Sequence, residues 1–218
     1  MSDLISAVTY EVSYWAVFFF FTLGYRLRIY GRQHVPRRGP VLVIANHQSL
    51  LDPPAIGLGI PRQIHYLAKK SLFTNPIFGL WLRTVRAVPI DQEGVGKEGM
   101  RNILTSLAGG NTVMVFPEGQ RTPDGQFHVL RPGVGLLVNR VRAPILPAAI
   151  VGAYEAWPRH GKFPVLSPLF LPWSRRSLTV VYGPPRDPAT LDGLSRAEML
   201  AVLHDDIAAA LKQAEALR

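Results

Sequence analysis

The chain has 218 residues, 48% of them hydrophobic, which is enough to build one domain with a sizeable core and a small accessory segment. It contains no cysteine, which excludes disulfides, thiolate metal ligands and a cysteine nucleophile. Lys and Arg outnumber Asp and Glu by 24 to 15, and the net charge of +9 favours anionic partners such as nucleic acid, anionic lipid or phosphorylated substrates.

The N-terminal segment is apolar and aromatic. Residues 12–25 carry no charge and would span about 21 Å as a helix, whereas a bilayer core needs ~30 Å. Acidic residues precede the segment and five arginines follow it by residue 38, so it does not have the pattern of a secretory signal. We expect a helix that lies in the membrane surface or is partly inserted, on the cytoplasmic face. The alternative is an ordinary buried helix that covers the domain.

The first polar motif follows the apolar, β-branched run Val41–Ala45, which predicts a buried strand. His47 comes directly after this strand, and Asp52 precedes Pro53, which predicts a helix with Asp52 as its N-cap. On a continuous helix the His47 and Asp52 side chains would point about 140° apart, so they can meet only across a turn. An imidazole beside a carboxylate is a candidate general base. The plainer interpretation is a loop histidine and a cap.

Strands and helices alternate along the remainder of the chain, which predicts an α/β fold with a mixed, largely parallel sheet flanked by helices. We divide the chain into a membrane-associating segment, 1–30, and an α/β domain, 31–218. Expected strands are 64–68, 85–92, 112–116, 143–150 and 178–183. Expected helices are 54–59, parts of 71–82, 100–107, 134–138 and 195–217, and 154–175 is expected to be irregular.

A second motif, Phe116-Pro117-Glu118-Gly119-Gln120-Arg121, follows the strand expected at 112–116. By spacing alone, Glu118 and Arg121 fit a structural ion pair as well as a binding site. With Asn46-His47 and Asp52 also present, residues 31–183 resemble the glycerolipid acyltransferases of the 1-acyl-sn-glycerol-3-phosphate acyltransferase type. That family carries Asn-His-x4-Asp first and Phe-Pro-Glu-Gly-x-Arg later.

The resemblance implies transfer of a fatty acyl group from acyl-CoA or acyl carrier protein to the sn-2 hydroxyl of a lysophosphatidate-like acceptor, in phospholipid biosynthesis. It implies that His47 is the general base and Asp52 orients it. It also implies that Arg121 binds the acceptor phosphate, Glu118 positions the acceptor or the site, and Gly119 allows close backbone approach. The substrate hydroxyl attacks directly, and the chain has no Gly-x-Ser-x-Gly element of a serine hydrolase.

Further candidates are Lys69 and Lys70, which follow a strand and could contact phosphate, although a solvated lysine pair has the same pattern. His128 lies near the second motif and is a weaker site candidate. No metal site and no cofactor are expected, because the other histidines lack ligand spacing and the thioester is a substrate.

Two alternatives remain open. Gln92 stands where the resembled family usually has an arginine, which favours a different acceptor, such as another lysolipid, an aminolipid or a polyol. A non-catalytic basic membrane- or nucleic-acid-binding module would suit the net charge. It would leave the two ordered motifs unexplained, and the usual nucleic-acid-binding motifs are missing from the sequence.

Overall fold

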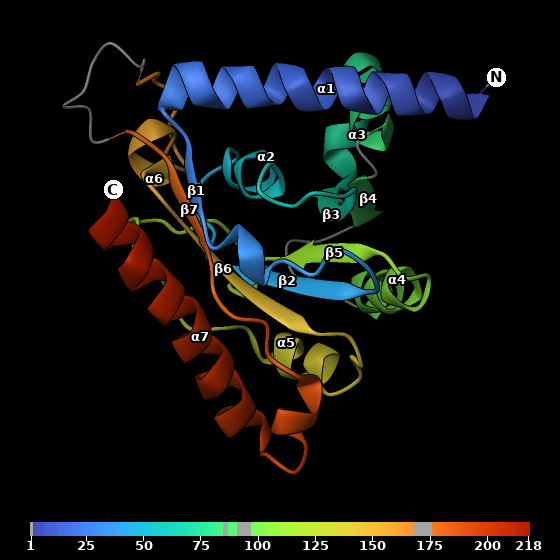
Figure 1. The fold of residues 1–218 in the computed structure, drawn as a ribbon, viewed down its shortest axis with the longest axis vertical. Coiled ribbons are helices and arrows are strands. Elements are labelled where there is room, and N and C mark those ends of the chain that lie inside the picture. Colours follow the sequence, from blue (N-terminus) through green and yellow to red (C-terminus); the bar gives the residue numbers. More distant parts are fainter. Residues whose placement is uncertain (1, 85–86, 91–96, 168–175) are drawn as a thin grey trace.

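The computed structural model describes residues 2–84, 87–90, 97–167 and 176–218, which form a sheet with helices on both faces (Figure 1). The strands are β1 (Arg28–Tyr30), β2 (Val41–Ala45), β3 (Ile64–Lys69), β4 (Ala87–Ile90), β5 (Thr112–Val115), β6 (Ile145–Val151) and β7 (Thr179–Tyr182). The helices are α1 (Ser2–Tyr25), α2 (Asp52–Gly57), α3 (Pro76–Thr84), α4 (Lys97–Ala108), α5 (Pro132–Val138), α6 (Ala153–Ala156) and α7 (Arg196–Leu217). Short 3-10 turns are η1 (Arg32–His34), η2 (Lys70–Phe73) and η3 (Pro188–Leu191).

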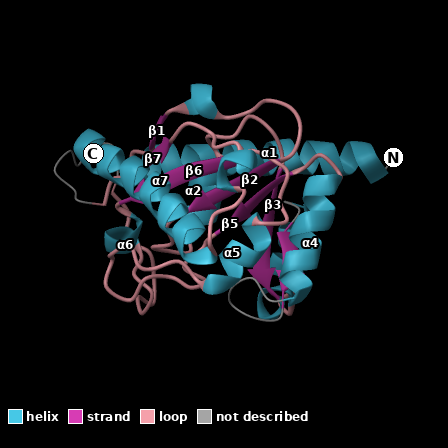
Figure 2. Ribbon diagram, turned by 90° about the horizontal axis from the view of Figure 1, so that it is seen from below, coloured by secondary structure: helices cyan, strands magenta, loops and turns pink. Residues whose placement is uncertain are grey.

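The described strands form one sheet in the order β1-β7-β6-β2-β5-β3-β4 (Figure 2). All neighbours pair in parallel except β6 and β7, which are antiparallel. Strand β2 lies between β5 and β6, and all five of its residues are buried, as expected for a central strand covered on both faces. The predicted fold class, a mixed and largely parallel sheet flanked by helices, is confirmed.

Alternate residues of β2 enter two separate cores. Val41, Val43 and Ala45 belong to the core beneath α1 and α2, whereas Leu42 and Ile44 belong to the core beneath α4, α5 and α7. This alternation follows from the period of two in a strand. The sheet is therefore sandwiched between two helical layers (Figure 1).

Helix α1 is longer than expected and has two different faces. Phe21 and Tyr25 on its inner side are buried in the core. Its outer side exposes Trp15 and Phe19, each with more than half of its surface accessible. Among the described residues, no helix has the length and apolar character needed to cross a membrane.

Several details differ from the sequence-based expectation. Strand β1 was not predicted, because three residues are too few to show a period of two. It pairs with β7, so the sheet includes residues of the segment 1–30. Helix α6 overlaps the beginning of the stretch 154–175 that was expected to be irregular. Strand β4 falls within the predicted 85–92, but Gln92 lies outside the described residues.

Candidate active site

The two motifs meet because the strands that precede them are neighbours. Strands β2 and β5 pair in parallel, with Ile44 opposite Val115, so the loops that follow them leave the sheet at the same edge. The backbone N–H of Thr122 donates to the carbonyl oxygen of His47 at 2.8 Å and joins the loops directly. In open α/β sheets, ligands bind at this carboxyl edge of the strands.

His47 and Asp52 form the close pair that the turn between them was expected to allow. The Nδ1 of His47 lies 2.7 Å from Oδ2 of Asp52, whose side chain is fully buried. The same Oδ2 accepts the backbone N–H groups of Gln48 and Ser49, at 2.6 and 2.7 Å. The predicted N-cap role of Asp52 is wrong: Leu51 occupies that position, and the carboxylate binds N–H groups upstream of α2.

This geometry sets the state of the imidazole. Because the Asp52 carboxylate accepts the Nδ1–H, the lone pair of the neutral His47 ring resides on Nε2. The ring stacks on Phe116, with centroids 3.9 Å apart, which holds its plane. Burial raises the pKa of the Asp52 carboxyl, and its hydrogen bond to His47 opposes that rise. The N–H groups of Gln48 and Ser49 are engaged by Asp52, so they are not available to stabilise an oxyanion.

Glu118 ties the backbones of the two motifs together. Its Oε1 accepts the backbone N–H of His47 at 2.7 Å, and its Oε2 accepts that of His128 at 3.1 Å. The side chain is buried, and burial raises its pKa. Gly119 has a φ of 75°, a left-handed conformation that favours glycine. The Nε of Arg131 donates to the carbonyl oxygen of Glu118 at 3.2 Å, which fixes the turn further.

Asn46 fastens the first motif to the strand on its other side. Its side-chain amide donates to the carbonyl oxygen of Ile150 at 2.9 Å and accepts the backbone N–H of Ile150 at 2.8 Å. The amide therefore reproduces a pair of sheet hydrogen bonds just beyond the end of β2. This explains why the loop turns where it does.

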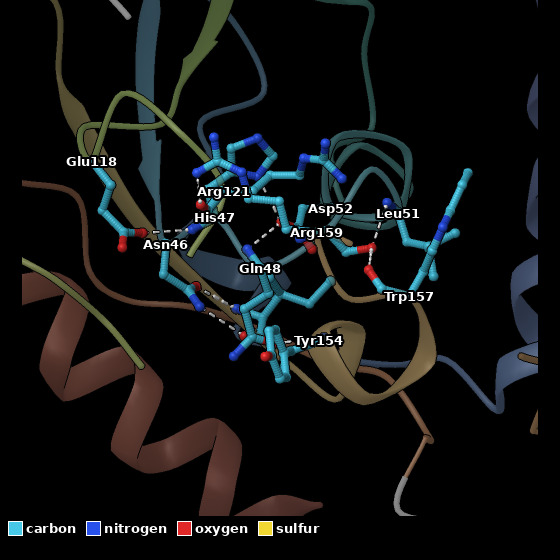
Figure 3. Close-up of polar contacts among 12 residues, drawn as sticks. Asn46, His47, Gln48, Leu51, Asp52, Glu118, Arg121, Tyr154, Trp157 and Arg159 are labelled. Atoms are coloured by element: carbon cyan, nitrogen blue, oxygen red, sulfur yellow. Dashed lines mark hydrogen bonds and ion pairs between the residues drawn. The ribbon is translucent and has the colours of Figure 1, made fainter. Parts of the chain in front are cut away.

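A third segment, residues 152–161 after β6, completes the site (Figure 3). The hydroxyl of Ser49 donates to the carbonyl oxygen of Trp157 at 2.8 Å, and the side chain of Gln48 accepts the N–H of Tyr154 at 3.4 Å. The Tyr154 hydroxyl donates to the carbonyl oxygen of Pro123 at 2.9 Å. The segment is thus bonded to both motifs. Sequence reasoning missed it because a Pro- and Trp-containing stretch has no strand or helix period.

The structure brings only some of the sequence-predicted residues together. Glu118, Gly119 and Arg121 lie in the loop beside His47. Lys69 is the last residue of β3, the neighbour of β5 on the same edge, and Lys70 forms an ion pair of 3.7 Å with Glu98 of α4.

His128 is a second histidine with an acidic partner near the motifs. Its Nε2 lies 2.8 Å from Oδ1 of Asp124, and both side chains are exposed. In the part of the chain that the structure describes, no group of three potential ligand side chains could hold a metal ion.

Comparison with known proteins identifies the family. The profile of the Acyltransferase family matches residues 26–151. The chain belongs to the Acyltransferase family. The matched region contains both motifs, and the chain is an O-acyltransferase.

Similar proteins extend this result. The 1-acyl-sn-glycerol-3-phosphate acyltransferase of Bacillus subtilis is 29% identical over 87% of this chain and 88% of its own length. That of Streptococcus pneumoniae is 29% identical over 51% of this chain and 41% of its own length. The crystal structure of PlsC, the 1-acyl-sn-glycerophosphate acyltransferase of Thermotoga maritima, has the same fold, with a TM-score of 0.74 and 22% identity over 97% of this chain and 80% of that one.

Proposed function

We propose that this acyltransferase moves a fatty acyl group from an acyl thioester to the sn-2 hydroxyl of a lysophosphatidate-like acceptor. The observation that carries the proposal is the His47–Asp52 pair at the edge of the sheet, with a buried carboxylate on Nδ1 of the ring. The similar proteins named as 1-acyl-sn-glycerol-3-phosphate acyltransferases support the acceptor. The donor is acyl-CoA or acyl carrier protein, and both present the same thioester.

The chemistry needs one base and no covalent enzyme intermediate. Nε2 of His47 takes the proton of the acceptor hydroxyl while its oxygen attacks the thioester carbonyl carbon. The C–S bond then breaks, and the leaving thiolate receives that proton. Asp52 holds the tautomer and stabilises the imidazolium formed in between. Glu118 keeps the backbone of His47 in place, and Arg121 contacts the acceptor phosphate.

The direct test is thiol release from an acyl thioester by the purified protein, with lysophosphatidate present or absent. We expect acceptor-dependent release, reduced by about 10²–10⁴-fold in His47→Ala. A wild-type rate in His47→Ala would refute the role of the base. Release with a phosphate-free lysolipid and none with lysophosphatidate would instead support the acceptor that Gln92 favours.

We also propose that the protein binds the cytoplasmic face of a membrane through α1. The supporting observation is the outer side of that helix, whose large apolar side chains are exposed: Val8, Val12, Trp15, Phe19, Phe20 and Leu23. The loop 163–166 adds Phe163, which is 79% exposed, and adjoins α1 through a 2.7 Å hydrogen bond from Ser167 N–H to the carbonyl oxygen of Gly24. Large exposed apolar side chains gathered along one helix suit a lipid surface.

Substitution of exposed residues tests this without disturbing the core. Deleting α1 would also remove Phe21 and Tyr25, which are buried. We therefore use Trp15→Ser with Phe19→Ser and measure co-sedimentation with anionic phosphatidylglycerol vesicles. The double variant should bind at least about tenfold more weakly, since each aromatic loses roughly 1.5–3 kcal/mol of burial.

Leu136→Ser is the matched control, because Leu136 is also exposed but lies on α5, beneath the opposite face of the sheet. It should sediment as the wild type does. Equal sedimentation of the double variant and the wild type would show that α1 is not the membrane contact.

A further inference from the structure

The segment after β6 places a second arginine beside the second motif. Nη1 of Arg159 donates to the carbonyl oxygen of Arg121 at 3.2 Å. The next residue, Thr122, donates its N–H to the carbonyl oxygen of His47. These two hydrogen bonds, joined through the neighbouring residues Arg121 and Thr122, connect Arg159 to the proposed base. Figure 3 shows the side chains of Arg121 and Arg159 near that of His47.

Arg159 is held in this position by its own loop. The indole N–H of Trp157 donates to the carbonyl oxygen of Gly161 at 2.9 Å and closes the loop around Arg159. The hydroxyl of Ser49 in turn donates to the carbonyl oxygen of Trp157, and Ser49 lies inside the first motif, between His47 and Asp52. Arg159 is thus bonded to the second motif and belongs to a loop that is bonded to the first, so the fold determines its position.

The guanidinium of Arg159 retains donors for a ligand. It is half-buried, and one hydrogen bond, to Arg121, is formed with the residues that the structure describes. No described carboxylate forms an ion pair with it. A guanidinium has five N–H groups in a planar fork that matches the oxygens of a phosphate.

We propose that Arg159 and Arg121 together form a binding site for a phosphate monoester next to His47. Arg121 as a phosphate ligand belongs to the proposed function, on which this inference rests. Arg159 adds a second cation and thereby sets the preference for a substrate that carries a phosphate monoester. Two substrates could supply that group: the lysophosphatidate acceptor and the 3′-phosphate of an acyl-CoA donor.

Binding of a soluble phosphate monoester tests the site independently of turnover. Calorimetry with glycerol 3-phosphate compares the wild type, Arg159→Gln and Arg140→Gln. Arg140 is an exposed arginine that follows α5 and precedes β6, at the opposite edge of the sheet, and contacts Sδ of Met100 at 3.6 Å. We expect Arg159→Gln to weaken binding roughly tenfold to a hundredfold, the range for a charge-assisted hydrogen bond, and Arg140→Gln to bind as the wild type does.

Kinetics then identify the source of the phosphate. We compare kcat/KM for lysophosphatidate with that for monoacylglycerol, and for acyl-CoA with that for its 3′-dephospho form. Arg159→Gln should reduce one of these two ratios about tenfold or more, mainly through KM, and Arg159→Lys should restore part of it because it keeps the charge without the fork.

The outcomes separate this inference from the proposed function. Equal glycerol 3-phosphate binding by the wild type and Arg159→Gln, or no binding by the wild type, would overturn the site. So would a loss of kcat/KM that leaves both ratios unchanged, since that indicates a structural defect. Arg159-dependent binding in a protein that does not acylate lysophosphatidate would support the site and refute the proposed acceptor.

Discussion

Asp52 and Glu118 are two buried carboxylates that both contact His47, but they contact different parts of it. Asp52 receives the ring Nδ1–H and two neighbouring backbone N–H groups on a single oxygen, Oδ2. Glu118 uses one oxygen for the backbone N–H of His47 and the other for that of His128, in a different loop. Asp52 therefore acts on the imidazole that we propose as the base, whereas Glu118 acts on the framework that carries it.

The same substitution, acid to amide, separates these roles because the oxygens are used differently. In Asp52→Asn the amide oxygen can keep all three hydrogen bonds, and the NH₂ replaces Oδ1, which has no hydrogen-bond partner among the described residues. What is lost is the negative charge that stabilises an imidazolium. We expect kcat to fall about 10²-fold or more while the protein remains folded. Thiol-release kinetics measure kcat, and circular dichroism on the same preparation measures whether the variant is folded.

Glu118→Gln should show the opposite balance. The Gln side chain has one acceptor for two N–H donors, so its NH₂ must face the N–H of His47 or His128. A buried donor left without a partner costs about 1–3 kcal/mol, which lowers Tm by roughly 2–4 °C per kcal/mol in a chain of this size. Calorimetric melting measures this. The comparison fails if Glu118→Gln melts with the wild type, or if Asp52→Asn is the less stable variant.

Much of the fold was predictable because burial imposes strong patterns. Strand β2 is a continuous apolar run. Helix α7 is preceded by the N-cap Ser195, which forms a capping box with Glu198, and its buried residues recur at helical spacing. Strand β1 could not be predicted, since its three half-buried residues have no pattern and exist as a strand only through pairing with β7. Long-range pairing, rather than local sequence, determines such elements.

The residues of the candidate site also divide into those that the sequence could predict and those that it could not. His47, Asp52 and Glu118 were predictable from short motifs that follow strands, and the parallel register of β2 and β5 then brings them together. The partners of the motifs were not predictable. Arg159 reaches the site only through the fold of residues 152–161. The hydroxyl of Ser49 donates to the carbonyl oxygen of Trp157, which lies 108 residues later in the sequence. Nothing local in the sequence signals such contacts.

The smallest expected effect is on how the free energy of unfolding depends on pH, and it concerns the same two carboxyls. Burial raises the pKa of both carboxyls, Asp52 and Glu118. The folded state then holds the proton more tightly than the unfolded chain, where these values are about 3.9 and 4.3. Each carboxyl contributes stability that is full below its unfolded pKa and is lost as pH rises through the raised folded pKa.

The substitutions Asp52→Asn and Glu118→Gln each replace a titrating carboxyl by an amide that does not titrate. Relative to the wild type, the stability of Asp52→Asn should therefore increase with pH, and the stability cost of Glu118→Gln should shrink with pH. Urea unfolding between about pH 5 and about pH 8 measures both differences. Glu198→Gln is the control, because hydrogen bonds from Ser195 lower the pKa of Glu198 below its unfolded value of about 4.3. Glu198 is thus ionised in both states through most of this range, and its difference from the wild type should stay flat. A flat difference for Asp52→Asn as well would mean that its carboxylate stays charged when buried, stabilised by His47 more strongly than burial penalises it.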